Sequence, residues 1–129
     1  MTVSPTKWIK FLNTHLPWIL IIILVAIQSN LSDNSSTHPL EYSDKLVHFT
    51  IFGVLGWLFA RAIFKTDNNF LKRNYFIMTL IFVTIFAITD EIHQSFVPGR
   101  DADVLDLVAD ISGALLFLLI FSRKKSLRD

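Results

Sequence analysis

The sequence predicts an all-α integral membrane protein that folds as one domain over residues 1–129, with four helices in a bundle. Hydrophobic residues make up 52% of the chain, and they gather in four apolar stretches at residues 11–28, 44–64, 75–96 and 104–121. Each stretch reaches or approaches the length of about 20 residues that a helix needs to cross a hydrocarbon core of about 30 Å. The stretches lack the alternation of apolar and polar residues that is typical of membrane β-strands.

The basic residues predict how the four spans are oriented. Ten of the twelve lie before the first span, from the last turn of the second span to the start of the third, or after the fourth, and the two exceptions are Lys45 and Arg100. Since loops rich in Lys and Arg stay on the cytoplasmic side, we expect both termini and the middle loop to be cytoplasmic. The loops at residues 29–43 and 97–103 then face outward, together with most of the acidic residues.

The first span has a second interpretation. Lys7 and Lys10, followed by an apolar run at residues 16–27, also resemble the basic and apolar regions of a signal peptide. No convincing cleavage site with small residues follows the run, so we expect an uncleaved span and keep a cleaved signal peptide as the alternative. The chain has no cysteine, which excludes disulfides and thiolate chemistry.

The second span begins with two ionisable residues, Asp44 and His48, which are four positions apart and therefore share a helix face. A carboxylate at this spacing can fix the tautomer of the imidazole or raise its basicity. Further along the span, Gly53, Gly56 and Ala60 form a stripe of small residues that lets another helix approach closely. We expect this face of the second span to be buried.

The third span carries Asp90 and Glu91 near its outer end, and Gln94 follows one turn later. At a rise of about 1.5 Å per residue, Asp90 lies several ångströms below the outer surface. Charged side chains at this depth are costly in contact with lipid. We therefore expect both carboxylates to point into the bundle.

The fourth span repeats the four-residue spacing with Asp106 and Asp110, and Gly113 lies one turn further along that face. The loop before this span contains Arg100, the only arginine predicted on the outer side. Its guanidinium is therefore the expected counter-charge for the acids, or the binding group for an anion.

Taken together, these motifs resemble those of the VanZ-like membrane proteins. The family pattern is Asp-Lys-x-x-His at the start of one span, Asp-Glu-x-x-Gln near the end of the next, then Pro-Gly-Arg and Asp-x-x-x-Asn before a final helix with small residues. The resemblance covers residues 44–118, and the chain matches the pattern at Asp44, Lys45, His48, Asp90, Glu91, Gln94, Pro98, Gly99, Arg100, Asp106 and Gly113. Asp110 stands where the family usually has Asn, which makes this site more acidic. The resemblance implies a small multi-pass protein of the bacterial inner membrane, in a family whose namesake is associated with resistance to the glycopeptide teicoplanin.

Each motif also has a purely structural interpretation as a helix start, a locked loop or a hydrogen bond between helices, the last worth about 0.6 kcal/mol per contact. However, five carboxylates, an imidazole, an amide and a guanidinium gather here from three helices and a loop. Desolvating so many charges for structure alone is costly when apolar residues pack as well. We therefore predict one outward polar site made of Asp44, His48, Asp90, Glu91, Gln94, Arg100, Asp106 and Asp110.

Two functions of different class fit this site. The first is a binding protein for membrane lipids, or for a lipid-linked envelope precursor, with Arg100 on a phosphate and the acids on hydroxyls or amines. The second is a small membrane-embedded hydrolase or transferase, in which His48, Asp90 and Glu91 act as acid and base groups or a divalent metal is bound. The sequence has no recognisable nucleophile, and it gives no reason to expect a nucleic-acid partner. Transport coupled to protons is disfavoured because the acids stop at one side.

Overall fold

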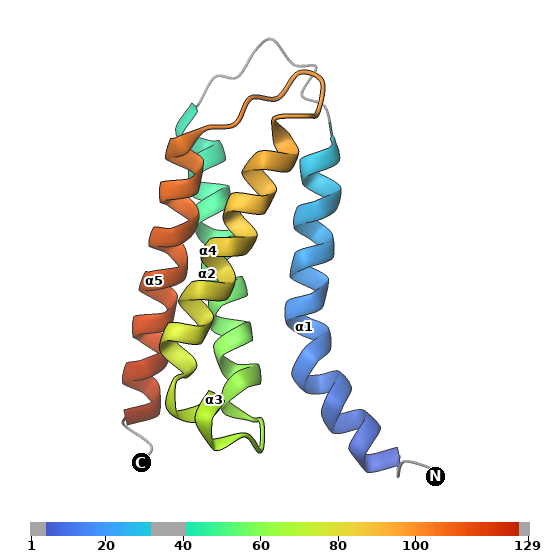
Figure 1. Ribbon diagram of the computed structural model, residues 1–129, viewed down its shortest axis with the longest axis vertical. Helices are drawn as coiled ribbons and strands as arrows, with labels where there is room; N and C mark the ends of the chain where they lie inside the picture. Colours follow the sequence, from blue (N-terminus) through green and yellow to red (C-terminus); the bar gives the residue numbers. More distant parts are fainter. Residues whose placement is uncertain (1–4, 32–40, 127–129) are drawn as a thin grey trace.

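The computed structural model describes residues 5–31 and 41–126, and this part of the chain folds into four long helices and one short helix (Figure 1). The long helices are α1 (Pro5–Asn30), α2 (Glu41–Phe64), α4 (Tyr75–Gln94) and α5 (Val104–Ser126). The short helix α3 (Asn69–Arg73) lies in the connection between α2 and α4. All four long helices are long and apolar enough to cross a membrane, which confirms the predicted all-α membrane fold.

Helices α1 and α5 extend beyond the predicted apolar spans, and α4 ends before its predicted limit. Helix α1 begins at Pro5 rather than at residue 11, and α5 continues to Ser126 rather than ending at 121. The polar and basic residues at these ends continue the helix, although they do not belong to the apolar run that predicted it. In contrast, α4 ends at Gln94 rather than at 96, because a turn with Gly99 at φ 82° follows.

Helices α2 and α5 approach each other closely, because glycines lie where they cross. A Cβ atom added to Gly113 would lie 1.9 Å from the backbone oxygen of Phe49, and one added to Gly53 would lie 2.6 Å from the ring of Phe117. Gly56 faces the backbone of Ala114 in the same seam. The predicted stripe of small residues therefore does form a helix–helix contact, in which α5 packs directly against the backbone of α2.

The apolar core lies below the outer polar residues, and partly buried aromatic rings pack against its aliphatic residues. Phe52 and Leu55 of α2 are fully buried, together with Val83 of α4 and Ala114 of α5. The rings of Phe59 and Phe82 are stacked with centroids 3.8 Å apart. Helix α4 turns its opposite face outward, where a regular series of exposed isoleucines suits contact with lipid: Ile77, Ile81, Ile85, Ile88 and Ile92.

Helix α1 is the least embedded of the four, since only Val25 and Ser29 are buried in it. Figure 1 shows α1 beside the others near the loop that precedes α5 and bending away from them toward its start. Pro17 lies inside the helix, which accounts for a bend because proline removes a backbone hydrogen bond. Trp18 nevertheless touches the core, with its ring edge-on to Phe59 at 5.3 Å.

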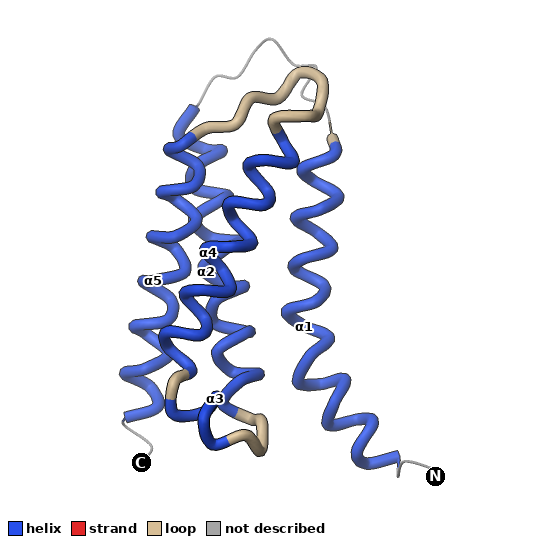
Figure 2. The backbone as a smooth tube through the Cα atoms, viewed as in Figure 1, coloured by secondary structure: helices blue, strands red, loops and turns tan. Residues whose placement is uncertain are grey.

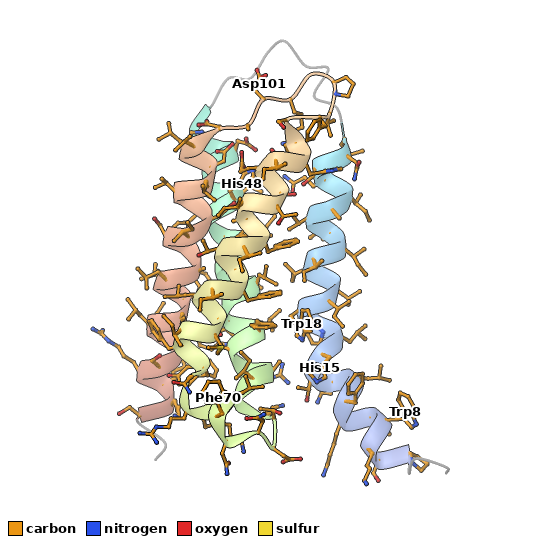
Figure 3. All side chains as sticks on the ribbon, in the orientation of Figure 1. Trp8, His15, Trp18, His48, Phe70 and Asp101 are labelled. Carbon is orange, nitrogen blue, oxygen red and sulfur yellow. The ribbon has the colours of Figure 1, made fainter. Side chains whose placement is uncertain are left out.

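The two ends of the bundle differ in what they carry. The start of α1, the end of α5 and helix α3 lie at one end, which we call the inner end (Figure 2). The loop at residues 95–103, with Asp101 in it, lies at the other, which we call the outer end (Figure 3). These names follow the predicted orientation. Most of the first predicted outer loop lies outside the described residues.

Candidate functional site

His48 of α2 is the centre of the polar residues at the outer end, where Figure 3 shows it inside the bundle. Its side chain is buried, and one ring nitrogen lies within 4.8 Å of carboxylate oxygens of Glu91 and Asp110. In a second group, a ring nitrogen of His48 also lies within 4.8 Å of carboxylate oxygens of Asp44 and Asp106. Three helices therefore bring four of the predicted acidic residues to one imidazole.

The closest carboxylate to the imidazole comes from α5. Nδ1 of His48 lies 3.0 Å from Oδ1 of Asp110, and both side chains are buried. The four-residue spacing within α2 had suggested Asp44 as the partner that orients the ring. An oxygen of Asp44 does lie within 4.8 Å of a ring nitrogen, but its side chain is exposed and the hydrogen-bonded carboxylate is that of Asp110. The close packing of α5 at Gly113 explains the difference, because Asp110 lies one turn before it and is carried against α2.

Three atoms around this pair are buried and have no hydrogen-bond partner. They are Nε2 of His48, Oε1 of Glu91 and Oδ2 of Asp110. If Nδ1 donates its proton to Asp110, then Nε2 is an acceptor like the two oxygens. An unpaired buried polar group costs about 1–3 kcal/mol, so three of them on neighbouring side chains need an explanation. The cluster lacks hydrogen-bond donors, and a donor group or a cation would complete it.

The other carboxylate oxygen of Glu91 is occupied. Its Oε2 accepts a hydrogen bond of 2.8 Å from the backbone N–H of Asp103, in the loop that leads into α5. This contact ties the end of α4 to the start of α5 and holds the Glu91 side chain in place. Glu91 is therefore fixed by Oε2, while its Oε1 is buried without a hydrogen-bond partner.

Asp90 belongs to a second network, which joins α1 to α4. The hydroxyl of Ser29 donates a short hydrogen bond to Oδ1 of Asp90, and Nε2 of Gln94 donates to Oδ2 at 2.8 Å. All three side chains are buried. Both carboxylate oxygens of Asp90 thus have a partner, so this network holds α1 and α4 together.

A small cavity lies between His48 and the network of Asp90, and neither Glu91 nor Asp110 lines it. It has a volume of about 10 Å³, enough for about one water molecule, and α1, α2 and α4 supply its walls. Its polar lining residues are Gln28, Ser29, His48, Asp90 and Gln94. The site is therefore open to a group no larger than a single hydroxyl or ammonium, with His48 in its wall.

The cation beside the acids is Lys45, and Arg100 has a different partner. Nζ of Lys45 lies 2.6 Å from Oδ2 of Asp103 and 2.9 Å from Oδ1 of Asp106. The hydrogen bond from Lys45 lowers the pKa of the Asp103 carboxyl. Arg100 donates to the backbone oxygen of Gln28 at 3.0 Å and so caps the end of α1. Among the described residues Arg100 has no ion pair, which corrects its predicted role as counter-charge to the acids.

The donor types at the centre fit a divalent metal ion. An imidazole nitrogen and two carboxylate oxygens within 4.8 Å of one another suit metal–ligand bonds of about 2.0–2.2 Å. The orphaned atoms of His48, Glu91 and Asp110 support the same fit, since a cation would satisfy buried lone pairs that now have no partner. The second group, with Asp44 and Asp106, is less suited because Asp106 already accepts from Lys45.

Sequence reasoning missed three participants. Lys45 was visible within the Asp-Lys-x-x-His motif, and the available signal was that it is one of the two basic residues on the predicted outer side. Asp103 contributes through its backbone N–H as well as its carboxylate, and no sequence pattern reveals a backbone donor. Ser29 is an ordinary serine at the end of an apolar run, and only the packing of α1 against α4 gives it a role.

A comparison with protein-family models adds one finding. The model described as VanZ/LLP1 matches residues 2–125, which is nearly the whole chain. No curated protein and no solved structure matches the chain.

Proposed function

The chain belongs to the VanZ/LLP1 family, and we propose that this multi-pass membrane protein binds the polar head of an envelope lipid or of a lipid-linked envelope precursor. The binding site is the acidic cluster around His48, and the protein resides in the bacterial inner membrane with its outer end facing outward. One observation carries the proposal. Nε2 of His48, Oε1 of Glu91 and Oδ2 of Asp110 are all buried without a hydrogen-bond partner, on three side chains that bring a ring nitrogen and two carboxylate oxygens within 4.8 Å of one another.

The chemistry of these atoms selects the group that is bound. All three are acceptors when Nδ1 of His48 is protonated, so the ligand must offer hydrogen-bond donors or positive charge. An ammonium or hydroxyl group of a head group meets this need. The cavity beside His48 has room for about one such group, so the rest of the head group remains outside the enclosed space.

Two basic side chains near the same end can contact the phosphate that a lipid head group carries. Arg100 donates one N–H to the backbone oxygen of Gln28, and Gln28 itself lines the cavity. A guanidinium has five N–H donors, so others remain for an anion. Lys45 is engaged with Asp103 and Asp106, which makes it the less available of the two.

A second candidate function is catalysis on the same head group, as a hydrolase or transferase. The pair of His48 and Asp110 favours it, because a carboxylate on Nδ1 orients the ring and leaves Nε2 free as a base. A divalent metal held by His48, Glu91 and Asp110 would supply an activated water instead. Binding is preferred because no side chain in the cluster is set up as a nucleophile, although carboxylate and histidine catalysis does not require one.

The family association with teicoplanin gives a cellular test. Glu91→Gln keeps the shape of the side chain but removes its charge and its capacity to accept a proton. If Glu91 is catalytic, cells that depend on this protein would lose essentially all protection against teicoplanin when they carry the Glu91→Gln variant at an unchanged protein level. A head-group binder keeps a large part of it, because the amide oxygen still accepts.

Binding itself is measured with the purified protein in detergent by native mass spectrometry, with phosphatidylethanolamine as the probe. Phosphatidylethanolamine supplies an ammonium group, and phosphatidylcholine is the matched lipid whose quaternary nitrogen has no N–H. We expect preferential retention of phosphatidylethanolamine, weakened in Glu91→Gln and unchanged in Asp101→Asn, a variant of an exposed acid in the outer loop. Equal retention of both lipids by all three proteins would contradict the proposal.

A further inference from the structure

A large open cavity lies at the inner end, far from the site around His48. It has a volume of about 560 Å³ and lies between the end of α2 and the end of α5. Four of its lining residues are basic, and we call them with their cavity the inner basic pocket: Arg61, Lys65, Lys124 and Lys125. The remaining walls are the aromatic rings of Trp57, Phe64 and Phe121.

The four cations have no acidic partners in the part of the chain that the structure describes. The ion pairs of that part all lie at the outer end. Two of the lysines lie over aromatic rings instead, with Nζ of Lys124 5.2 Å from the ring centre of Trp57 and Nζ of Lys125 4.5 Å from that of Phe64. Rings attract a cation without neutralising its charge. The inner basic pocket therefore keeps a concentrated positive charge that is available to an anion.

Acidic residues are few near this end in the sequence. Between Ala62 and Thr89 the chain has one acid, Asp67, and from Ile111 onward it has one, Asp129. Basic residues in membrane proteins also occur at this end for reasons of orientation alone. Orientation, however, requires only that the charges be on one side, and does not require four of them to line one cavity with aromatic walls.

We propose that the inner basic pocket binds the phosphate of an anionic phospholipid, with the aromatic rings against the upper part of its acyl chains. The pocket lies at the ends of two helices that are long and apolar enough to cross a membrane, which places it where lipid head groups are. Basic pockets between such helices are suited to anionic head groups. Its aromatic walls favour a ligand with an apolar part, so a lipid fits better than a soluble phosphate.

The proposal is independent of the head-group site at the outer end. No residue is shared between the two, and the outer site presents acceptors whereas the inner basic pocket presents donors and positive charge. Loss of binding at one site should leave binding at the other site intact. An anionic lipid and a lipid with an ammonium group therefore serve as separate probes for the two ends.

The test measures retention of phosphatidylglycerol by the full chain in detergent, using native mass spectrometry, with phosphatidylcholine as the neutral control. The double variant Arg61→Gln and Lys124→Gln removes two charges from the pocket. At about 1 kcal/mol for each basic residue near a charged lipid surface, we expect about a tenfold or greater loss of phosphatidylglycerol binding. The matched control, Lys7→Gln with Lys10→Gln, removes two exposed charges from α1 at the same end and should bind normally.

Further variants and a competition measurement make each outcome of this test decisive. If the double variant does not fold, judged by circular dichroism and gel filtration, the single variant Lys65→Gln replaces it, since this side chain is exposed. Excess inorganic phosphate should not displace the lipid, and full displacement would assign the pocket to soluble phosphate. The proposal is overturned if the pocket variant and the α1 control retain phosphatidylglycerol equally, or if phosphatidylcholine binds as well as phosphatidylglycerol.

Discussion

The outer and inner ends of the bundle use charge in opposite ways, although α2 and α5 contribute to both. At the outer end the ionisable groups are buried between helices, and His48, Glu91 and Asp110 keep free acceptor atoms. At the inner end the cations line an open cavity and lie over aromatic rings. The difference teaches that the position of a charge relative to the bundle decides what it can recognise. Buried acceptors select a small donor, whereas partly exposed cations select a bulky anion.

The outer end has the larger free-energy cost of burying polar groups. Transfer of polar groups away from water is costly unless each finds a partner, and the cost is larger for charges. Asp90 meets this condition through Ser29 and Gln94, but the atoms around His48 meet it only in part. Structure alone therefore explains the network of Asp90 better than the one around His48.

The largest expected effect comes from Gly113, on which the shared framework of both ends depends. In Gly113→Ala the new Cβ would lie 1.9 Å from the backbone oxygen of Phe49, so α2 and α5 must separate. We expect a loss of about 3 kcal/mol in the free energy of unfolding, at the upper end of the usual range for overpacking. Thermal unfolding in detergent measures it.

Gly56→Ala is the matched control, because its Cβ would approach Ala114 no closer than 3.4 Å. We expect this variant to lose less than about 1 kcal/mol. Equal stability of the two variants would show that the seam between α2 and α5 is looser than the structure indicates.

The next effect concerns the pair of His48 and Asp110, studied by a double-mutant cycle with His48→Phe and Asp110→Leu. Each single change leaves a buried partner unpaired, and we expect it to cost about 1–3 kcal/mol of folding stability. The double variant should be no less stable than either single one, because it removes both polar groups. Additive losses would mean that the two side chains do not interact.

The smallest effect is expected at Lys45, which joins the exposed Asp103 to the buried Asp106. The exposed pair contributes little, and the amide of Lys45→Gln still offers a hydrogen-bond donor to Asp106, so we expect a loss of about 1 kcal/mol or less in the free energy of unfolding, and less still at high salt. Chemical denaturation at two salt concentrations measures the difference. A loss that is large and independent of salt would place Lys45 among the buried groups around His48.

The fold was largely predictable, and the pairing within the site was not. Apolar runs of the right length predicted the four spans, and the spacing of Gly53 and Gly56 predicted a close helix contact, because both signals lie within one helix. The partner of His48 depends instead on how α5 is rotated against α2. Spacing along one helix pointed to Asp44, but the hydrogen-bonded carboxylate is that of Asp110.

Loop geometry limited the prediction in the same way. Arg100 was the obvious cation for the acids by position in the sequence, but the loop turns it toward the carbonyl of Gln28. The cation that pairs with the acids is instead Lys45, near the start of α2. Contacts made by a loop that folds back over helix ends depend on its backbone path, which a single sequence specifies only at residues such as Gly99.

Nitrogen-15 NMR of the His48 imidazole tests most directly whether the free acceptors at the outer end form a binding site. The protein is labelled at histidine and studied in detergent, and the His48 signals are assigned by comparison with His48→Gln. We predict that Nδ1 is protonated through its contact with Asp110 and that Nε2 is unprotonated in the protein alone. Addition of phosphatidylethanolamine should shift the Nε2 signal, and addition of phosphatidylcholine should not. An Nε2 signal that is already protonated, or that responds to neither lipid, would contradict the account.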